Sequence, residues 1–226
     1  MAPPPCVAVD ESTDLAAALR ELGLSIGRPA LVVVGGAAGL EDHATDRLIP
    51  ALEALCEVAG ERGAVIVDGG TDSGVMALLG DLHSALGVPT PLVGVGVASL
   101  VGAPGETGVA PEPHHTHFVL VPGARWGDET PWLARVASAL AAGQPSATVL
   151  VNGGDIALTD VRESVDAGRP VLVLAGSGRV SEELVRALRG GPGSAEVASL
   201  AGNELVTAVC VDDPDAMKAA VRALLE

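Results

Sequence analysis

Aromatic side chains are nearly absent from this sequence, which has one Phe, two Trp and no Tyr among its 226 residues. Proteins that bind single-stranded nucleic acid stack successive bases on such rings. Basic side chains are also scarce, because 13 Lys and Arg stand against 29 Asp and Glu, and the net charge is −16. Since phosphate backbones are bound mainly by Lys and Arg, we expect neither nucleic acid nor an anionic membrane surface as a partner.

Cysteine is represented only by Cys6, Cys56 and Cys210, which are far apart and form no CxxC or Cys/His zinc spacing. We therefore expect free thiols in a reducing compartment, and hence a cytoplasmic protein. The first residues contain no basic region followed by an apolar one, so no signal peptide is expected. The most apolar stretch, residues 91–104, is interrupted by three glycines and is too short to span a bilayer.

Small aliphatic residues are abundant, since 48% of the chain is hydrophobic and most of that fraction is Ala, Val and Leu. Such a core suits a sheet that helices cover on both faces. Short apolar runs alternate with amphipathic stretches, which predicts an α/β fold: a Rossmann-like, doubly wound, mostly parallel sheet of about six to seven strands. We expect a single domain over residues 1–226, with a strand-helix extension at 1–28 and a core at 30–226.

The pattern predicts core strands at residues 30–36, 64–68, 92–97, 117–121, 147–151, 170–174 and 205–211, and one more at 6–9. Helices are predicted at 15–22, 46–61, 75–86, 131–142, 156–167, 181–189 and 214–225. Pro50 is tolerated only in the first turn of its helix. Residues 99–114 and 191–203 show no periodicity and are predicted as loops; the first is long enough to indicate a function.

Glycines gather where four of the predicted strands end. In a parallel sheet, ligands bind outside the carboxyl ends of the strands. Glycine lets the backbone approach a phosphate closely, and the helix that follows directs N–H groups at the same place. One such turn is usually only a tight turn, but four on one edge favour a phosphate or nucleotide site. Its predicted residues are Gly35, Gly36, Gly69, Gly70, Thr71, Ser73, Gly74, Asn152, Gly153, Gly154, Gly176, Ser177 and Gly178.

Several motifs of known chemistry are missing. The first turn is not a strict GxGxxG, and neither GxxxxGK[ST] nor GxSxG occurs, so P-loop and serine-hydrolase chemistry have no support. Arg125 and Arg135 could pair with a pyrophosphate or could simply be solvated. Asp68 and Asp155 flank glycine turns and could bind a ribose hydroxyl or serve as turn and cap residues.

Other polar residues remain open as candidates. His114, His115 and His117 have no companion metal-binding pattern, so we expect solvated loop histidines, no metal site and no required cofactor. An enzyme would need a positioned acid or base at the phosphate site. Spacing singles out none of the candidates, and we therefore assign no catalytic residue and favour a binding protein over an enzyme. Those candidates are Asp68, Asp72, Asp128, Glu129, Asp155 and Glu163.

Five segments in sequence order, at residues 33–36, 63–76, 115–121, 151–154 and 175–179, resemble the SLOG/LSDAT superfamily. The resemblance is to free-standing prokaryotic relatives of the amino-terminal domain of melastatin-type TRP channels, related to Lonely-guy and Smf/DprA proteins. It implies a Rossmann-like sensor of an NAD-derived or other nucleotide ligand such as ADP-ribose. It also implies that residues 69–74 and 176–179 are ligand loops, which adds Arg179, and that Arg135 contacts the ligand.

Two departures from the superfamily bear on function. The chain has no channel, so a signal would pass to a separate effector protein. The phosphoribohydrolase signature PGGxGTxxE is absent, and residues 122–127 and 152–155 match it only in part. A nucleotide-processing hydrolase of the Lonely-guy type, cutting an N-glycosidic or phosphoester bond, is therefore the alternative to a sensor. The superfamily habit and the apolar composition lead us to expect a homodimer.

Overall fold

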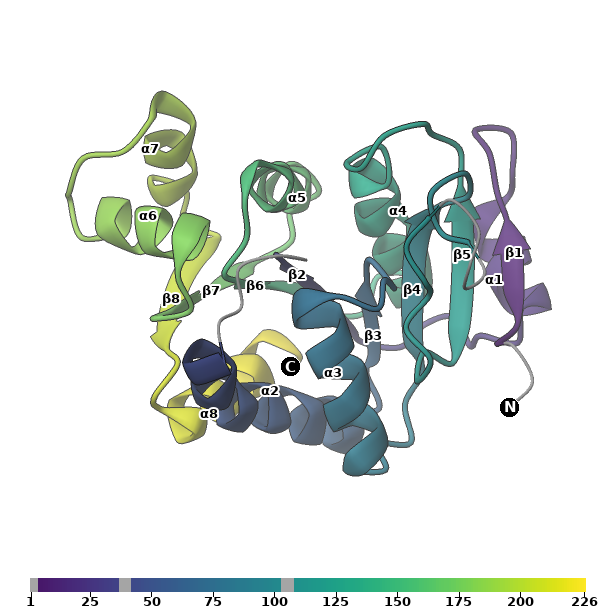
Figure 1. Cartoon of the computed structure of the whole chain (residues 1–226), viewed down its shortest axis with the longest axis horizontal. Helices are drawn as coiled ribbons and strands as arrows, with labels where there is room; N and C mark the ends of the chain where they lie inside the picture. Colours follow the sequence, from purple (N-terminus) through teal and green to yellow (C-terminus); the bar gives the residue numbers. More distant parts are fainter. Residues whose placement is uncertain (1–3, 37–41, 103–107) are drawn as a thin grey trace.

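The computed structural model describes residues 4–36, 42–102 and 108–226. It contains one eight-stranded, all-parallel sheet with the strand order β1-β5-β4-β3-β2-β6-β7-β8 (Figure 1). This confirms the Rossmann-like, doubly wound class. The sheet has one strand more than the seven predicted for the core. The additional strand is β1, which was predicted in the amino-terminal extension and pairs with β5. The strands are β1 Cys6–Ala8, β2 Ala30–Gly35, β3 Val65–Asp68, β4 Leu92–Val97, β5 His117–Val121, β6 Ser146–Val151, β7 Val171–Ala175 and β8 Val206–Cys210.

Helices cover both faces of the sheet. Those of the described chain are α1 Leu15–Glu21, α2 Asp42–Arg62, α3 Gly74–Ala85, α4 Thr130–Ala141, α5 Asp155–Asp166, α6 Arg179–Leu188, α7 Ala195–Ala201 and α8 Pro214–Leu224. Helices α4, α5, α6 and α7 lie on one side in Figure 1, and α2, α3 and α8 lie on the other. Buried residues of α1 belong to the same core cluster as those of α4 to α7. None of these helices is long and apolar enough to cross a membrane.

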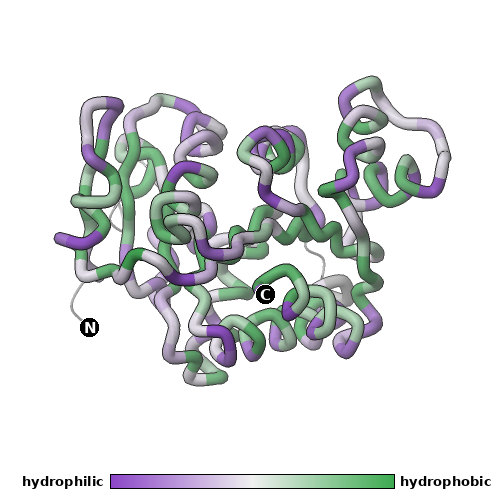
Figure 2. The backbone as a smooth tube through the Cα atoms, turned by 180° about the vertical axis from the view of Figure 1, so that it is seen from behind, coloured by the Kyte–Doolittle hydropathy of each residue, from purple (hydrophilic) through white to green (hydrophobic). Residues whose placement is uncertain are grey.

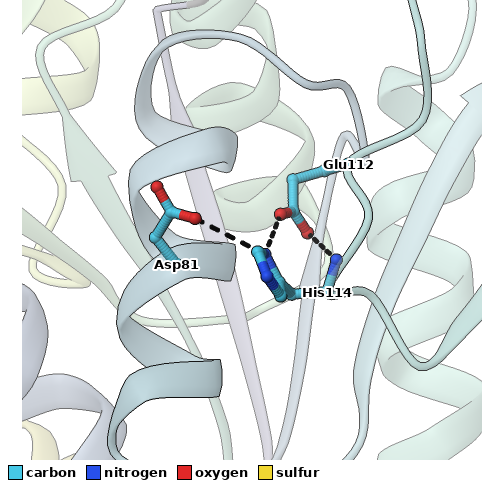
Figure 3. A group of neighbouring side chains, drawn as sticks. All are labelled: Asp81, Glu112 and His114. Carbon is cyan, nitrogen blue, oxygen red and sulfur yellow. Dashed lines mark hydrogen bonds and ion pairs between the residues drawn. The ribbon is translucent and has the colours of Figure 1, made fainter. Parts of the chain in front are cut away.

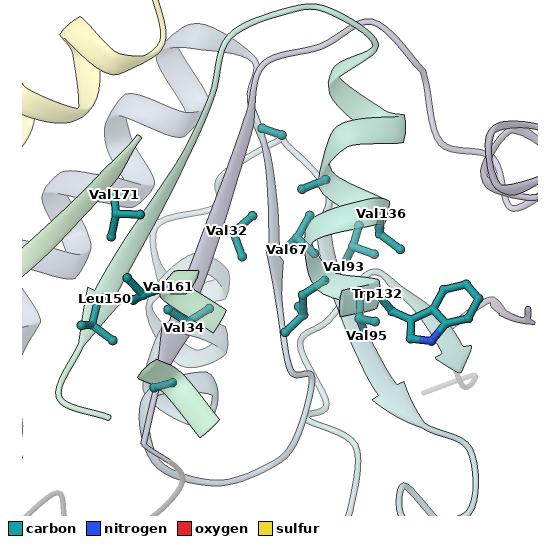
Figure 4. Close-up of a cluster of buried hydrophobic side chains, with 14 of the residues drawn as sticks. Val32, Val34, Val67, Val93, Val95, Trp132, Val136, Leu150, Val161 and Val171 are labelled. Atoms are coloured by element: carbon teal, nitrogen blue, oxygen red, sulfur yellow. The ribbon is translucent and has the colours of Figure 1, made fainter. Parts of the chain in front are cut away.

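Inner strands such as β2 and β4 are apolar and buried along nearly their whole length because both of their faces are covered. In β2, Val32 and Val34 lie in the cluster beneath α4 and α5 (Figure 4), whereas Leu31 and Val33 lie in the cluster with α2, α3 and α8. Successive residues of a strand point to opposite faces, so a strand buried on both faces shows no polar alternation. Figure 2 shows the chain from behind, coloured by hydropathy, and the central strands are mostly hydrophobic.

The chain changes direction across the sheet next to β2. It builds outward from β2 through β3, β4 and β5, and then returns to add β6 on the other side of β2. This reversal of strand order leaves a crevice outside the carboxyl ends of β2 and β6. Helices α3 and α5 both begin at that edge.

Two predictions about local structure are wrong. Pro50 lies inside α2, which begins at Asp42, and not in a first turn. The helix continues through the proline because Leu48, Leu52 and Leu55 of its buried face pack into the core, and tertiary packing outweighs a lost helical hydrogen bond.

The other error concerns the segment 191–203, which was predicted as a loop but contains α7. The Ser194 side chain caps this helix by accepting from the Val197 N–H at 3.2 Å. Only Val197 and Leu200 are buried, so the helix shows too few apolar residues for its periodicity to be visible in the sequence.

Candidate functional site

A cavity of about 490 Å³ opens at the crevice beside β2. The ends of β2 and β3 and the starts of α3, α4, α5 and α6 surround it. This is the place where the strand order predicts a ligand site in an open parallel sheet. It is lined by Val33, Val34, Gly35, Gly36, Gly69, Thr71, Ser73, Met76, Val109, Trp126, Glu129, Leu133, Gly154, Asp155, Ile156, Ala157, Asp160 and Arg179.

The four predicted glycine turns meet at this cavity. Of the predicted site residues, Gly35, Gly36, Gly69, Thr71, Ser73, Gly154 and Arg179 line it. The other predicted residues are not part of the lining: they are Gly70, Gly74, Arg135, Asn152, Gly153, Gly176, Ser177 and Gly178. Each turn therefore contributes at least one wall residue, and most of the remaining residues support the turns. Residues 37–41, including Gly39 of the first turn, lie outside the described part of the chain.

The turns after β6 and β7 are fastened to each other. The buried hydroxyl of Ser177 accepts from the Asn152 N–H at 2.8 Å and donates to the Leu174 carbonyl at 2.6 Å. The Ser181 hydroxyl donates to the Asn152 carbonyl at 2.9 Å. Asn152 and Arg179 both have positive φ, 59° and 49°. A non-glycine residue in this region is strained and persists only when its surroundings enforce it, and such residues cluster at functional sites.

Two of the glycines are required by close packing. A Cβ on Gly70, where φ is +65°, would lie 2.6 Å from a Phe118 ring carbon and 2.7 Å from the Gly94 Cα. A Cβ on Gly35 would lie 2.5 Å from the Val151 carbonyl oxygen. Gly70 thus holds its turn against β4 and β5, while Gly35 allows β2 and β6 to approach α3.

Helices that start at the cavity differ from those that start elsewhere. No side chain caps α3, α5 or α6, whereas Asp14, Ser194 and Asp213 cap α1, α7 and α8. In α6, the amides of Val180 and Ser181 donate to carbonyls of the β6 turn. In α3 the Val75 N–H likewise donates to the Gly36 carbonyl, at 3.2 Å. Of these three helices, α5 is therefore the one whose first turn is best placed to donate to an anion in the cavity.

Carboxyl groups line the side of the cavity between α4 and α5. Asp160 is only 8% exposed, and its Oδ1 has no hydrogen-bond partner within the described chain. Burial raises the pKa of Asp160 to about 7; the nearby Glu129 charge adds to the shift and the Thr130 hydroxyl opposes it. Burial also raises the pKa of Glu129, although the Gly127 N–H donates to its Oε2 at 2.8 Å.

Asp160 was not among the residues singled out in the sequence, although a signal for it exists. The buried residues of α5 are Ala157, Asp160, Val161 and Ser164, at helical spacing. An aspartate at the second of these core positions is anomalous, because buried charged groups are normally paired. Of the acid and base candidates that were named, Glu129 and Asp155 do line the cavity.

The chain was also compared with known protein families. A family model described as "SLOG in TRPM, prokaryote" matches residues 28–220. The chain belongs to this family. The match includes all four glycine turns, so the resemblance expected from the sequence is confirmed, and SLOG membership points to a nucleotide-related small molecule as the ligand. A search of curated proteins found no match.

One of the three loop histidines of this SLOG chain is buried, contrary to the expectation that all three are solvated. His115 is 3% exposed and lies between two carboxylates. Its Nε2 is 2.7 Å from Asp68 Oδ1, and its Nδ1 is 2.6 Å from Glu112 Oε2. Burial alone would lower the pKa of His115, but the two carboxylates outweigh it and raise the pKa to about 9. His115 is therefore a cation in the interior of the protein.

This buried trio fixes a wall of the SLOG cavity. Asp68 Oδ1 also accepts from the Gly70 N–H at 2.7 Å, and the Glu112 N–H donates to the Gly70 carbonyl at 2.9 Å. The turn at residues 69–74 is thus attached to the described end of the long loop. Asp68 acts as a turn residue here, one of its two predicted roles. Residues 103–107 of that loop lie outside the described part of the chain.

Asp81, Glu112 and His114 form a group that could hold a metal ion (Figure 3). His114 Nδ1 lies 2.7 Å from Glu112 Oε1 and 3.5 Å from Asp81 Oδ1. Both Glu112 oxygens already accept hydrogen bonds from His114 or His115. A metal would have to displace the His114 bond, and the arrangement is explained as a hydrogen-bonded cluster that supports the loop.

The two arginines predicted near a pyrophosphate lie apart from the cavity lining. Arg135 Nη1 pairs with Glu11 at 2.8 Å and its guanidinium lies 4.0 Å from the centre of the Trp132 ring. The side chain of Arg125 is 85% exposed. Among the described residues that line the cavity, Arg179 is the one cation that could pair with a phosphate.

Proposed function

We propose that this protein is a sensor that binds a nucleotide-derived ligand, such as ADP-ribose or another NAD-derived metabolite, in the cavity beside β2. The observation that carries this proposal is the convergence of four glycine-bearing turns on one cavity of about 490 Å³, at the starts of helices without side-chain caps. A volume of this size is within the range of small-molecule sites. We place the ligand phosphate over the turns that end β3 and β7, residues 69–74 and 176–179, with the turns that end β2 and β6 completing the crevice.

Arg179 is the proposed phosphate partner. Its guanidinium lies against the β6 turn, where a Cβ on Gly154 would be 2.9 Å from Arg179 Nη2. Gly154 thereby makes room for the arginine at the first turn of α5. A bidentate arginine is the side chain best suited to a phosphate, and helix-start amides can donate to the same anion.

The test begins with a thermal-shift screen of ADP-ribose, NAD, AMP, cyclic nucleotides and cytokinin-type nucleotides, followed by calorimetric titration of the best ligand. Loss of the Arg179 contact in Arg179→Ala should cost about 1.5 to 3 kcal/mol, which is roughly tenfold or more in affinity. The exposed Arg186, on the same helix, provides the control Arg186→Ala. Equal affinities of parent and Arg179→Ala would contradict this site.

A nucleotide-processing hydrolase of the Lonely-guy type is the second candidate, and the Asp160 carboxyl is the observation that favours it. Burial raises the pKa of Asp160 to about 7, and a general acid or base works best when its pKa lies near the operating pH. Incubating the best ligand with the protein and following release of free base or phosphate distinguishes the two. A hydrolase produces product that Asp160→Asn abolishes, whereas a sensor returns the ligand unchanged.

We further propose that the protein works as a cytoplasmic homodimer and signals to a separate effector protein. The free cysteines Cys6, Cys56 and Cys210 suit a reducing compartment. The apolar composition and the habit of the superfamily support a dimer. Light scattering at micromolar concentration measures the assembly directly, and a monomer would count against it.

A further inference from the structure

The cavity has two chemically different parts. The part beside β2 and β3 offers glycine backbone, helix starts and Arg179, which suit a phosphate, and one acidic residue, Asp155 at the start of α5, also lines the cavity. The part between α4 and α5 offers Trp126, Ile156, Glu129 and Asp160. Two acidic groups on an apolar wall repel a phosphate, so this second part calls for a different portion of the ligand.

The mouth of this second part is apolar and accessible. Trp126 is 43% exposed and Ile156 is 42% exposed, and both line the cavity. Within the described chain, the one other large hydrophobic side chain with comparable exposure is Leu86, at the end of α3. Exposed apolar side chains gathered at a cavity indicate a binding surface.

The loop that carries Trp126 is held in place by carboxylates. Asp128 Oδ2 accepts from the Ala124 and Arg125 N–H groups at 2.8 and 3.1 Å. Glu129 Oε2 accepts from the Gly127 N–H on the other side of the tryptophan. A ring presented on such a braced loop loses little conformational freedom when a ligand binds.

Asp160 supplies the polar end of this part. It lies one helical turn beyond Ile156, and residues four apart share a face of a helix. Its Oδ1 is buried without a hydrogen-bond partner in the described structure. A buried acceptor left unsatisfied costs free energy, which a donor on a ligand would recover.

We propose that the space between α4 and α5 is a nucleobase subsite, in which Trp126 stacks on the base and Asp160 accepts a hydrogen bond from an amino group of the base, as adenine carries. This inference rests on the proposed function and deepens it, because the phosphate site fixes the other end of the ligand. Above pH 7 the Asp160 carboxylate only accepts hydrogen bonds, so it disfavours a base that presents a carbonyl at that position.

The test is calorimetric titration at pH 8 with AMP, inosine monophosphate and ribose 5-phosphate. AMP should bind at least tenfold more tightly than either of the others. Trp126→Ala should weaken AMP about tenfold, in line with the usual contribution of one stacked base, and should leave ribose 5-phosphate unchanged. Leu86→Ala is the matched control for removal of an exposed apolar side chain, and should change neither affinity.

Asp160 is tested with the same ligands. Asp160→Asn should reduce the preference for AMP over inosine monophosphate to within about threefold, because an amide can both donate and accept. Asp166→Asn, an exposed substitution later in α5, should keep the preference intact. Trp126→Phe retains a stacking ring and should recover most of the AMP affinity that Trp126→Ala loses.

The outcomes separate this inference from the function on which it rests. If AMP and ribose 5-phosphate bind equally to the parent and Arg179→Ala weakens both, the phosphate site stands and the base subsite is wrong. If inosine monophosphate binds as well as AMP, the assignment of Asp160 is overturned. If none of the three nucleotides or sugars binds, and ADP-ribose and NAD do not bind either, the proposed function fails and the base subsite fails with it.

Discussion

Two pairs of buried carboxyl groups lie near the carboxyl edge of the same sheet, and their surroundings differ. Asp68 and Glu112 have the imidazolium of His115 between them, with hydrogen bonds of 2.7 and 2.6 Å. Asp160 and Glu129 line the cavity, where Asp160 Oδ1 has no partner among the described residues. The first pair attaches a turn to a loop, and the second faces a space that a ligand can enter.

This difference indicates that Asp68 and Glu112 stabilise the fold, whereas Asp160 and Glu129 belong to the candidate ligand site. A paired ionic group is costly to break, because removal of one member leaves the others charged and buried. Asp68 Oδ2 and Asp160 Oδ1 both lack a hydrogen-bond partner in the described structure, but of the two residues Asp160 is the one that lines the cavity, where a ligand could supply a donor. The sequence does not distinguish the roles of these four acidic residues, because all four carry the same charge. The residues that surround each of them in the folded protein do distinguish these roles.

The largest expected effect comes from removing His115, the cation that pairs with Asp68 and Glu112. His115→Ala should lower the free energy of unfolding by about 3 to 5 kcal/mol, because Asp68 and Glu112 stay buried without compensation. Urea denaturation at pH 6.5 measures it. His114→Ala is the control: His114 is half-buried beside Glu112 and should cost much less. Equal losses in the two variants would contradict the scaffold role of His115.

The pairing of His115 with Asp68 and Glu112 predicts that the folded protein loses stability at alkaline pH. The pKa of His115 is about 9 in the folded protein, above its ordinary value of 6.5. The stabilisation it provides is therefore complete below about pH 6.5 and is lost as the pH rises through 9. The parent should become less stable between pH 7 and 10, and His115→Ala should lack this part of the decline.

Asp160 also makes stability fall as the pH rises, but here because ionising its carboxyl is unfavourable in the folded protein, so removing this group should stabilise the protein and not destabilise it. Its pKa rises from 3.8 to about 7 on folding, so stability falls as the pH rises from 4 to 7 and then levels off. Asp160→Asn removes this term and should stabilise the protein by up to about 4 kcal/mol above pH 7, with little change near pH 4. Thermal unfolding over this pH range, with Asp166→Asn as the control, checks the prediction.

Substitutions at two helical glycines test whether the Glu112 carboxylate packs against α3. A Cβ on Gly80 in α3 would lie within 2.2 to 2.4 Å of the Glu112 carboxylate, so Gly80→Ala should displace that group and destabilise the protein by about 1 to 3 kcal/mol. A Cβ on Gly60 in α2 meets only Val88 and Pro89 at 3.5 Å and beyond. Gly60→Ala should therefore stabilise by up to about 1 kcal/mol through helix propensity. Stabilisation by both changes would disprove the proposed packing of Glu112.

The smallest effect is expected at Arg135, which the family resemblance assigned to the ligand. It pairs with Glu11 at the surface, where an ion pair contributes about 1 kcal/mol or less. Because Arg135 does not line the cavity, Arg135→Ala should leave ADP-ribose affinity within about twofold. A tenfold loss of affinity, measured by calorimetry, would show that Arg135 does contact the ligand.

Much of the fold was predictable because local patterns dominate it. Runs such as residues 30–35 are apolar at every position, which specifies strands covered on both faces. The short helix α7 was missed because only Val197 and Leu200 are buried in it. Pro50 was misplaced because its helix is stabilised by tertiary packing, which outweighs a local rule.

By itself, the sequence determined the α/β class, the parallel sheet, the SLOG family and the four glycine turns, since each depends on residues close together in the chain. Only the tertiary structure decided which residues of those turns face the cavity and which brace it. It also brought Asp68, 47 positions away, to His115, and left the Oδ1 atom of Asp160 without a hydrogen-bond partner among the described residues. The burial and pairing of a carboxylate depend on residues that are far from it in the sequence. A local sequence pattern therefore cannot specify whether the carboxylate stabilises the fold or binds a ligand.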